Sequence, residues 1–397
     1  MFKKIMKITG LFFAVLIVLT SAYMSTNWPF WSNVLTLTAN FSNSMTDESL
    51  YEPKATVIGD FKGAIPVAAT SKLSADTVNI LDSFVADNES AALIVYQGGA
   101  IQYEHYGAGY GAALRTESAS MAKSVLAMMV GAAIDDGYVE SVDDPIGKYY
   151  KDWAGTPKGD VSIKQYLRMS AGLRLHPMFG PPSSPMFQVY MGDDIRANMK
   201  TVDLEFVPGK EFQYSGLQTQ ALLLAIEDAS GKPYAEYVSE KLWQPLGAKD
   251  GAVWLDHEGG SPRGFCCLYA TARDWLRVGR MHLSLGNIDG QQLISANWMR
   301  DVITPSPNNP NYGYQTWLGT THETERGYNR DVSLKVKHDA PFAVDDLIYF
   351  DGAGGQRVYI SPSEDMVIVH TGPLNFEFEE SWLPNLIAGD LDPIISQ

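Results

Sequence analysis

The decisive stretch of this chain, Glu117-Ser118-Ala119-Ser120-Met121-Ala122-Lys123-Ser124, runs directly into an apolar segment at residues 125–134. Apolar residues occupy every face of that segment, so the pattern predicts a helix buried on all sides. Gly137 is placed to follow the C-terminal cap of this helix. Lys123 stands at its start, although lysine is rarely buried without a partner. Ser120 lies three residues earlier, and residues at i and i+3 share one face of a helix.

Ser120 and Lys123 form a candidate pair for acyl transfer. A serine hydroxyl becomes a good nucleophile only when a neighbouring base takes its proton. Burial and the positive end of a helix both lower the pKa of a lysine, which allows the neutral amine to be that base. The same helix N-terminus offers backbone N–H groups to the oxyanion of an acyl transfer. The alternative is structural, with Lys123 extending along the helix end to reach solvent.

The amino-acid composition excludes some classes of function. The 397 residues are 45% hydrophobic, enough for one large core or two adjoining ones. A net charge of −16 argues against nucleic acid or an anionic membrane surface as a partner. The sequence contains no His/Cys/Asp cluster with metal-ligand spacing and no phosphate-binding loop motif, so we predict neither a metal nor a cofactor. Cys266 and Cys267 are adjacent, and we expect two unreactive apolar thiols rather than a strained vicinal disulfide.

The N-terminus has the pattern of an export segment. Lys3, Lys4 and Lys7 precede an apolar run at residues 8–19, and small residues follow the run. The run is short for a membrane span, yet no clean cleavage site follows it. A signal peptide and a retained inner-membrane anchor therefore both stay open for residues 1–24. In either case we expect the rest of the chain in the periplasm, with the membrane or the secretion machinery as partner of this segment.

The remainder of the chain divides by its hydrophobic pattern. Residues 25–73 show little periodicity, which is typical of a linker or an N-terminal arm. Two β-rich runs around Gly98-Gly99 predict a hairpin, and strand-like runs return near the C-terminus. Short helices and loops are expected between them, at about residues 141–255. We predict one α+β domain over residues 74–397, with an antiparallel sheet from N- and C-terminal parts flanked by helices, and an inserted, mostly α-helical region.

Residues 178–191 are uncharged and rich in Pro and Met, and we predict a long loop there. A long loop inside a compact domain is usually functional or disordered, and this one is too apolar for disorder. Met178, Phe187 and Tyr190 would suit a flexible apolar wall of a substrate site.

With these motifs in hand, the chain resembles the serine β-lactamase and penicillin-binding superfamily. The resemblance begins with Ser120-x-x-Lys123, Tyr214-Ser215-Gly216 and the Gly-rich hairpin at residues 352–355. Within the superfamily the chain looks like the class C β-lactamase and esterase branch, and there it is similar to the 6-aminohexanoate-dimer (nylon-oligomer) hydrolase group. The supporting stretches are Ser120-Met121-Ala122-Lys123-Ser124, Glu211-Phe212-Gln213-Tyr214, Thr271-Ala272-Arg273-Asp274-Trp275-Leu276-Arg277-Val278-Gly279-Arg280-Met281 and Gly355-Gln356-Arg357-Val358-Tyr359.

The resemblance implies a role for each motif residue. Ser120 would be the acylated nucleophile, Lys123 its proton partner, and Tyr214 a second base or proton relay. Which of Lys123 and Tyr214 takes the serine proton stays open at this point. Tyr214 also has a simpler interpretation as a loop aromatic that caps the next helix. The oxyanion hole would consist of the N–H groups of Ser120 and Ala353.

Two departures from the family pattern concern the substrate. Phe350-Asp351-Gly352 stands where the family has Lys-Thr-Gly, so Asp351 and Gly352 are expected at the substrate, with Asp351 repelling a substrate carboxylate. Gly216 replaces the amide side chain that lactamases carry two residues after the tyrosine. His370-Thr371-Gly372 looks like the third motif but comes one strand too late, so we expect His370 merely to end a strand.

We therefore expect an exported serine hydrolase that cleaves small esters or linear amides, 6-aminohexanoate oligomers among them, through a Ser120 acyl-enzyme. One alternative is a D,D-peptidase, penicillin-binding protein or β-lactamase. Another is a non-catalytic protein that binds cell-wall peptide. The intact Ser-Lys-Tyr set argues against the last, because an inactive site has no reason to keep all three.

Overall fold

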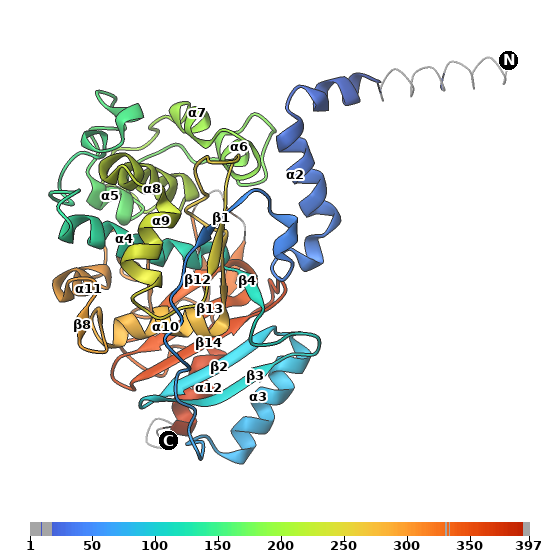
Figure 1. Cartoon of the computed structure of the whole chain (residues 1–397), viewed down its shortest axis with the longest axis vertical. Coiled ribbons are helices and arrows are strands. Elements are labelled where there is room, and N and C mark those ends of the chain that lie inside the picture. Colours follow the sequence, from blue (N-terminus) through green and yellow to red (C-terminus); the bar gives the residue numbers. More distant parts are fainter. Residues whose placement is uncertain (1–8, 10–17, 330–331, 333, 392–397) are drawn as a thin grey trace.

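The computed structural model describes residues 9, 18–329, 332 and 334–391. In this part of the chain the main sheet is antiparallel and six-stranded, with the strand order β3-β2-β14-β13-β12-β9 (Figure 1). Two neighbouring strands come from the N-terminal part and the others from the C-terminal part, which confirms the predicted α+β architecture. The strands are β2 (Ala92–Gln97), β3 (Ala100–Tyr106), β9 (Trp317–Leu318), β12 (Ile348–Gly352), β13 (Gln356–Ser361) and β14 (Met366–Thr371).

The main sheet is covered on both faces, as the continuous apolar run of β2 requires. Ala92 and Ile94 join the core beneath α10 (Ala272–Leu283), whereas Leu93 and Val95 join the core beneath α3 (Ala75–Asp87) and α12 (Trp382–Leu391). The β2–β3 hairpin turns at Gly98-Gly99, where φ values of 61° and 90° suit glycine. Helices α3 (Ala75–Asp87) and α12 (Trp382–Leu391) lie side by side on the outer face (Figure 1).

A second antiparallel sheet leads into the decisive stretch. Its strand order is β1-β5-β6-β4, and β4 ends three residues before Ser120. Its strands are β1 (Lys54–Val57), β4 (Arg115–Glu117), β5 (Gly251–Trp254) and β6 (Leu268–Thr271). Two short hairpins complete the described strands: β7 (Asn287–Ile288) with β8 (Gln291–Gln292), and β10 (Glu325–Gly327) with β11 (Lys335–Lys337).

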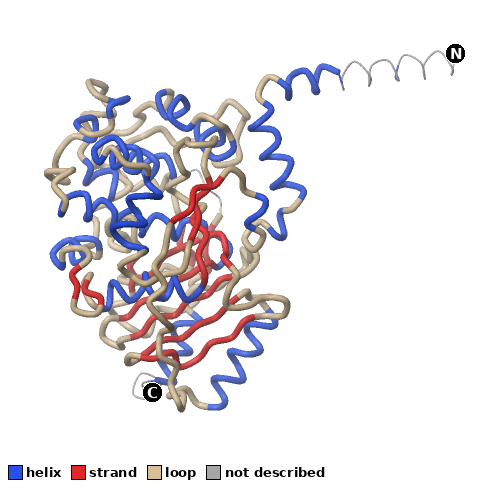
Figure 2. Tube along the Cα trace, in the orientation of Figure 1, coloured by secondary structure: helices blue, strands red, loops and turns tan. Residues whose placement is uncertain are grey.

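The inserted region is helical, and Figure 2 shows its helices gathered beside the sheets. One of its helices, α8 (Gly216–Ser230), packs against α4 (Ala122–Asp135), which precedes the insertion in the chain. Every residue of α4 from Ala122 to Ala133 is buried, and Gly137 follows its cap with a φ of 78°, both as predicted. The other helices are α5 (Ile163–Leu167), α6 (Pro185–Met191), α7 (Ile195–Lys200), α9 (Tyr234–Val238) and, after the insertion, α11 (Ala296–Val302).

Two segments differ from the sequence prediction. Residues 25–73 contain α2 (Trp28–Ala39) as well as β1, which pairs with β5 and so joins this arm to the second sheet. The second half of the predicted loop 178–191 is α6, which begins at a proline in a position that favours helix initiation. The two unexpected helices pack together, with the rings of Phe30 and Phe187 4.9 Å apart. Each helix is stabilised by packing against the other, so the residue pattern of either segment alone predicts a helix only weakly.

Most of the predicted export segment at residues 1–24 lies outside the described residues. Within the described ranges, no helix combines the length and the apolar character needed to cross a bilayer.

Candidate active site

Ser120 and Lys123 meet at the start of α4. Ser120 sits in the tight turn Ala119–Met121, and Lys123 follows in the first turn of the helix. The Lys123 Nζ donates to Ser120 Oγ at 2.7 Å and to the carbonyl oxygen of Phe265 at 2.8 Å. Only 2% of Lys123 is exposed. The alternative of a lysine reaching solvent is therefore wrong, because its amine is held inside the protein.

Tyr214 lies beside the Ser120–Lys123 pair. The Lys123 Nζ lies 4.9 Å from the centre of the Tyr214 ring. Residues 328 and 329 hold the Tyr214 backbone in place. The Tyr214 N–H donates to the Tyr328 carbonyl oxygen, and Asn329 Nδ2 donates to the Tyr214 carbonyl oxygen. The cap of α8 is Ser215, whose Oγ accepts the Leu217 N–H, so Tyr214 is not needed as a capping residue.

The two proton-carrying groups are shifted in opposite directions. Burial lowers the pKa of Lys123 to about 7, although Asp351 and Glu117 oppose the shift. Burial raises the pKa of the Tyr214 phenol well above its ordinary value, although a hydrogen bond with Ser120 opposes this. Near neutral pH the site thus combines a lysine amine that can be neutral with a phenol that keeps its proton. Such a pair can accept a proton at one group and donate one from the other.

The end of β12 lies against the Ser120 turn. A Cβ on Gly352 would stand 2.6 Å from the Ser118 carbonyl oxygen, so only glycine lets the strand approach this closely. Ala353 begins the turn that follows, on the same side. Ser120 and Ala353, the expected oxyanion donors, therefore belong to two segments in direct contact.

Asp351 is not exposed to the substrate, and the expected repulsion of anions is wrong. Its carboxylate is buried, 2.8 Å from Arg326 Nη2 and 2.6 Å from Arg357 Nη1. Glu380 completes the cluster, 2.8 Å from Arg326. Two cations and two carboxylates balance in this cluster. Asp351 is thus a neutralised structural group behind Tyr214.

The expected apolar wall is only partly at the site. Tyr190 is the nearest of the three residues, because its ring contacts Phe265, whose carbonyl oxygen holds Lys123. Phe187 packs between Phe30 and Phe179, which makes it a core residue rather than a substrate contact. Met178 is partly exposed in the loop before α6.

Gly216 is explained by packing. A Cβ there would lie 2.9 Å from the Phe265 ring and 3.1 Å from the Met186 methyl group. The space of the amide side chain found in lactamases is therefore filled by apolar atoms.

The cysteine prediction is wrong, because Cys266 and Cys267 form a vicinal disulfide. It lies directly after Phe265 and beside Glu117, a buried residue that the sequence interpretation passed over. The only sequence signal for Glu117 was its place in the decisive stretch.

His370 lies in β14, two strands away from β12, in agreement with its predicted register. Its ring is buried between the Gly355 carbonyl oxygen and Ser90 Oγ, at 2.7 and 2.8 Å. Burial lowers the pKa of His370 to about 4, so it is neutral in the physiological range.

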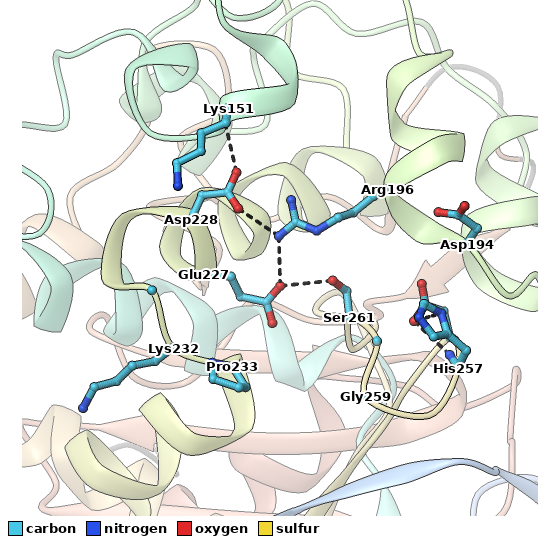
Figure 3. A pocket seen from close by; sticks show the side chains of 13 residues that line it. Lys151, Asp194, Arg196, Glu227, Asp228, Lys232, Pro233, His257, Gly259 and Ser261 are labelled. Atoms are coloured by element: carbon cyan, nitrogen blue, oxygen red, sulfur yellow. Dashed lines mark hydrogen bonds and ion pairs between the residues drawn. The ribbon is translucent and has the colours of Figure 1, made fainter.

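A cavity of about 500 Å³ elsewhere in the helical region is shown in Figure 3. Three of its charged groups pair with one another: Arg196 lies 3.0 Å from Asp228 and 3.4 Å from Glu227, and Ser261 Oγ donates to Glu227. Ser120, Lys123 and Tyr214 are not part of its lining. This cavity therefore contributes nothing to the catalytic arrangement.

The fold and the Ser-Lys-Tyr arrangement define a hydrolase of the serine β-lactamase type. The family model described as Beta-lactamase matches residues 78–371, and the chain belongs to this family.

Two curated relatives and one solved structure show which kinds of protein this chain is similar to. The chain is 30% identical over 226 residues to the 6-aminohexanoate-dimer hydrolase of Paenarthrobacter ureafaciens, covering 53% of this chain and 56% of the relative. It is 28% identical over 135 residues to a D-alanyl-D-alanine-carboxypeptidase/endopeptidase of Escherichia coli (strain K12), covering 33% and 35% of the two chains. The matches thus span about a third to a little over half of these curated relatives. A solved structure from Bacillus anthracis, provisionally named a 6-aminohexanoate-dimer hydrolase, shares the fold with a TM-score of 0.71 and 20% identity, covering 89% of this chain and 93% of that one.

Proposed function

We propose that this protein hydrolyses small neutral esters or linear amides through an acyl-enzyme on Ser120. One observation carries the proposal: the Lys123 amine lies 2.7 Å from the Ser120 hydroxyl, in a buried setting that lowers its pKa to about 7. A lysine with a pKa near neutrality has a substantial neutral fraction at pH 7, and the neutral amine is the base that an unactivated serine needs.

Each residue has one task in the proposed reaction. Neutral Lys123 takes the hydroxyl proton as Ser120 Oγ attacks the carbonyl carbon. The N–H groups of Ser120 and Ala353 stabilise the oxyanion, a contribution typically worth about 3 kcal/mol per donor. Tyr214 donates its phenol proton to the leaving oxygen or nitrogen and is reprotonated by the Lys123 ammonium, so both groups return to their starting states. Water then attacks the acyl-enzyme, with the same groups working in reverse.

The charge distribution supports a neutral acyl group. The family's cation is replaced by Phe350, whose ring packs against His282. The nearest arginines in the described part of the third-motif region, Arg326 and Arg357, are buried and paired with Asp351 and Glu380. They are unavailable to a carboxylate, so binding one here would leave it desolvated without a partner. The similarity to the 6-aminohexanoate-dimer hydrolase agrees with a linear amide.

A substrate comparison tests this proposal. We expect p-nitrophenyl esters of short acids and linear ω-amino-acid amides to exceed nitrocefin in kcat/KM by about tenfold or more, since a missing polar partner typically costs that much. All three substrates are measured on one preparation, with the Ser120→Ala variant as the blank. If nitrocefin proves the best substrate, the lactamase alternative replaces this one.

A D,D-peptidase is the second candidate, favoured by the similarity to the Escherichia coli carboxypeptidase/endopeptidase. It requires recognition of a terminal carboxylate, for which the paired arginines are unsuited. A stable penicillin adduct in the intact mass, together with release of D-alanine, would favour this candidate.

We also propose that the chain is exported, because Lys3, Lys4 and Lys7 precede the apolar run at residues 8–19. An alkaline phosphatase fused after about residue 30 should be active, since this reporter works only outside the cytoplasm. A fusion lacking residues 1–24 is the control. Equal, low activity of both fusions would contradict export.

A further inference from the structure

Glu117 contacts both the segment that carries Ser120 and the segment that holds the Lys123 amine. It is the last residue of β4 and only 4% exposed. One carboxylate oxygen, Oε1, accepts two backbone N–H groups, that of Ala119 at 2.9 Å and that of Cys267 at 2.5 Å. Ala119 directly precedes Ser120, and Cys267 follows Phe265 by two residues. A single oxygen atom therefore ties the segment of the nucleophile to the segment that holds the base.

Both N–H donors belong to strained residues. Ala119 has a φ of 45° and Cys267 a φ of 68°, in the left-handed region that residues with a side chain seldom adopt. Such conformations persist only where the surroundings hold them, and they gather at functional sites. The Ala119 conformation directs the Ser120 N–H, and the Cys267 turn directs the Phe265 carbonyl oxygen that receives Lys123. Both therefore depend on the same carboxylate oxygen.

Glu117 also differs electrostatically from the other carboxylate near Lys123. Asp351 is neutralised by Arg326 and Arg357, whereas burial raises the pKa of Glu117 to about 7, although the backbone N–H groups of Cys267 and Ala119 oppose the shift. Both carboxylates raise the pKa of Lys123 against the effect of burial. The other titratable groups that sense Glu117 are three buried tyrosines on the arm, α6 and β6, which stay protonated because burial raises their pKa: Tyr51, Tyr190 and Tyr269.

We propose that Glu117 is a positioning residue of the active site, which clamps the strained turns beside Ser120 and Lys123. The inference rests on the proposed function, because it assigns Glu117 a role in the chemistry of Ser120 and Lys123. The clamp and the charge can be separated, since both hydrogen bonds use one oxygen and an amide retains one.

Glu117→Gln keeps an acceptor oxygen for both N–H groups and removes the charge. Because burial raises the pKa of Glu117 to about 7, the wild-type carboxyl is itself largely uncharged below that pH. We therefore expect the acidic limb of kcat/KM for a p-nitrophenyl ester to stay close to that of the wild type. At pH 8.5, where Lys123 is already neutral, kcat should stay within a few-fold of the wild type.

Glu117→Ala removes the clamp as well. We expect kcat to fall by about 100-fold, comparable to the loss of one oxyanion donor, with KM changed only a few-fold. Asp274→Asn is the matched control, since Asp274 is a buried carboxylate on α10 that accepts the Lys249 N–H at 3.1 Å. Its pH profile should coincide with that of the wild type.

The outcomes separate this inference from the proposed function. Labelling of wild-type Ser120 by a fluorophosphonate, read as intact mass, tests the proposed function alone, and failure there removes both ideas. If the wild type is labelled but Glu117→Gln loses as much kcat as Glu117→Ala, the role of the hydrogen-bonding oxygen is refuted. Full kcat in a folded Glu117→Ala variant refutes the clamp. Should that variant not fold by circular dichroism, kcat of Glu117→Gln at pH 8.5 decides, since a loss of about 100-fold there would contradict the clamp.

Discussion

Ser120→Ala is expected to abolish turnover of every ester or amide that the wild type cleaves, by roughly 10⁴-fold or more. The acyl-enzyme cannot form without the hydroxyl, and neighbouring side chains offer no substitute in the same place. The turn Ala119–Met121 carries Ser120, whose Oγ lies 2.7 Å from the Lys123 amine. The measurement is initial-rate hydrolysis of a p-nitrophenyl ester, together with intact mass after a fluorophosphonate.

Ser124→Ala is a matched control on the same helix. The Ser124 hydroxyl is buried and donates to the Gln315 carbonyl oxygen at 3.0 Å, so it has no part in the catalytic set. We expect this variant to be labelled and to keep its activity within a few-fold. More than a trace of activity in Ser120→Ala, with Ser124→Ala intact, would show that the nucleophile is another residue.

Loss of the Lys123 amine should have the second-largest effect. Lys123→Met keeps an unbranched apolar side chain in the buried position but provides no base. We expect kcat to fall by about 10³-fold, within the range of general-base catalysis. Tyr214→Phe should also cost activity, and the two losses should not add, because the groups act as a unit. Additive losses in the double variant would argue against a shared proton path.

The pH dependence of kcat/KM tests the role of Lys123 as the base, because the direction of the expected change is fixed. The pKa of Lys123 is lowered to about 7, so acidification below pH 7 protonates the amine and should reduce kcat/KM in the wild type. Raising the pH through 7 should restore it. A wild-type profile that is flat between pH 5.5 and 8.5, on a substrate for which chemistry is rate-limiting, would contradict the base assignment.

The same shift predicts a change in stability. The unfolded chain binds a proton at Lys123 up to a pKa of about 10.5, whereas the folded chain releases it near 7. The unfolded state therefore binds more protons in this window, and the free energy of unfolding rises with pH through it. At pH 7 Lys123→Met should increase the free energy of unfolding by on the order of a few kcal/mol. Urea titration measures it, and a less stable variant would show that the lysine is not buried at a cost.

Elements whose signal lies within a short stretch of residues could be predicted from the amino-acid sequence. The unbroken apolar run after Lys123 could only be a fully buried helix, and α4 is one. The Gly98-Gly99 turn between two β-rich runs specified the β2–β3 hairpin, because a tight turn depends on its own backbone angles. The order of strands along the chain also placed His370 away from β12, because the strand that contains Arg357 comes between them.

Tertiary structure alone decided the features that depend on partners distant in the chain. α2 and α6 form because their apolar faces cover each other, which neither segment reveals alone. Asp351 appeared to be a free negative charge between Phe350 and Gly352, yet Arg326 from another hairpin and Arg357 across the strand neutralise it. Glu117 gained its importance from an N–H group 150 residues away. Charge and hydrogen bonding act through space over a few ångströms, so the identity of a residue is known from sequence but its electrostatic state follows from the fold.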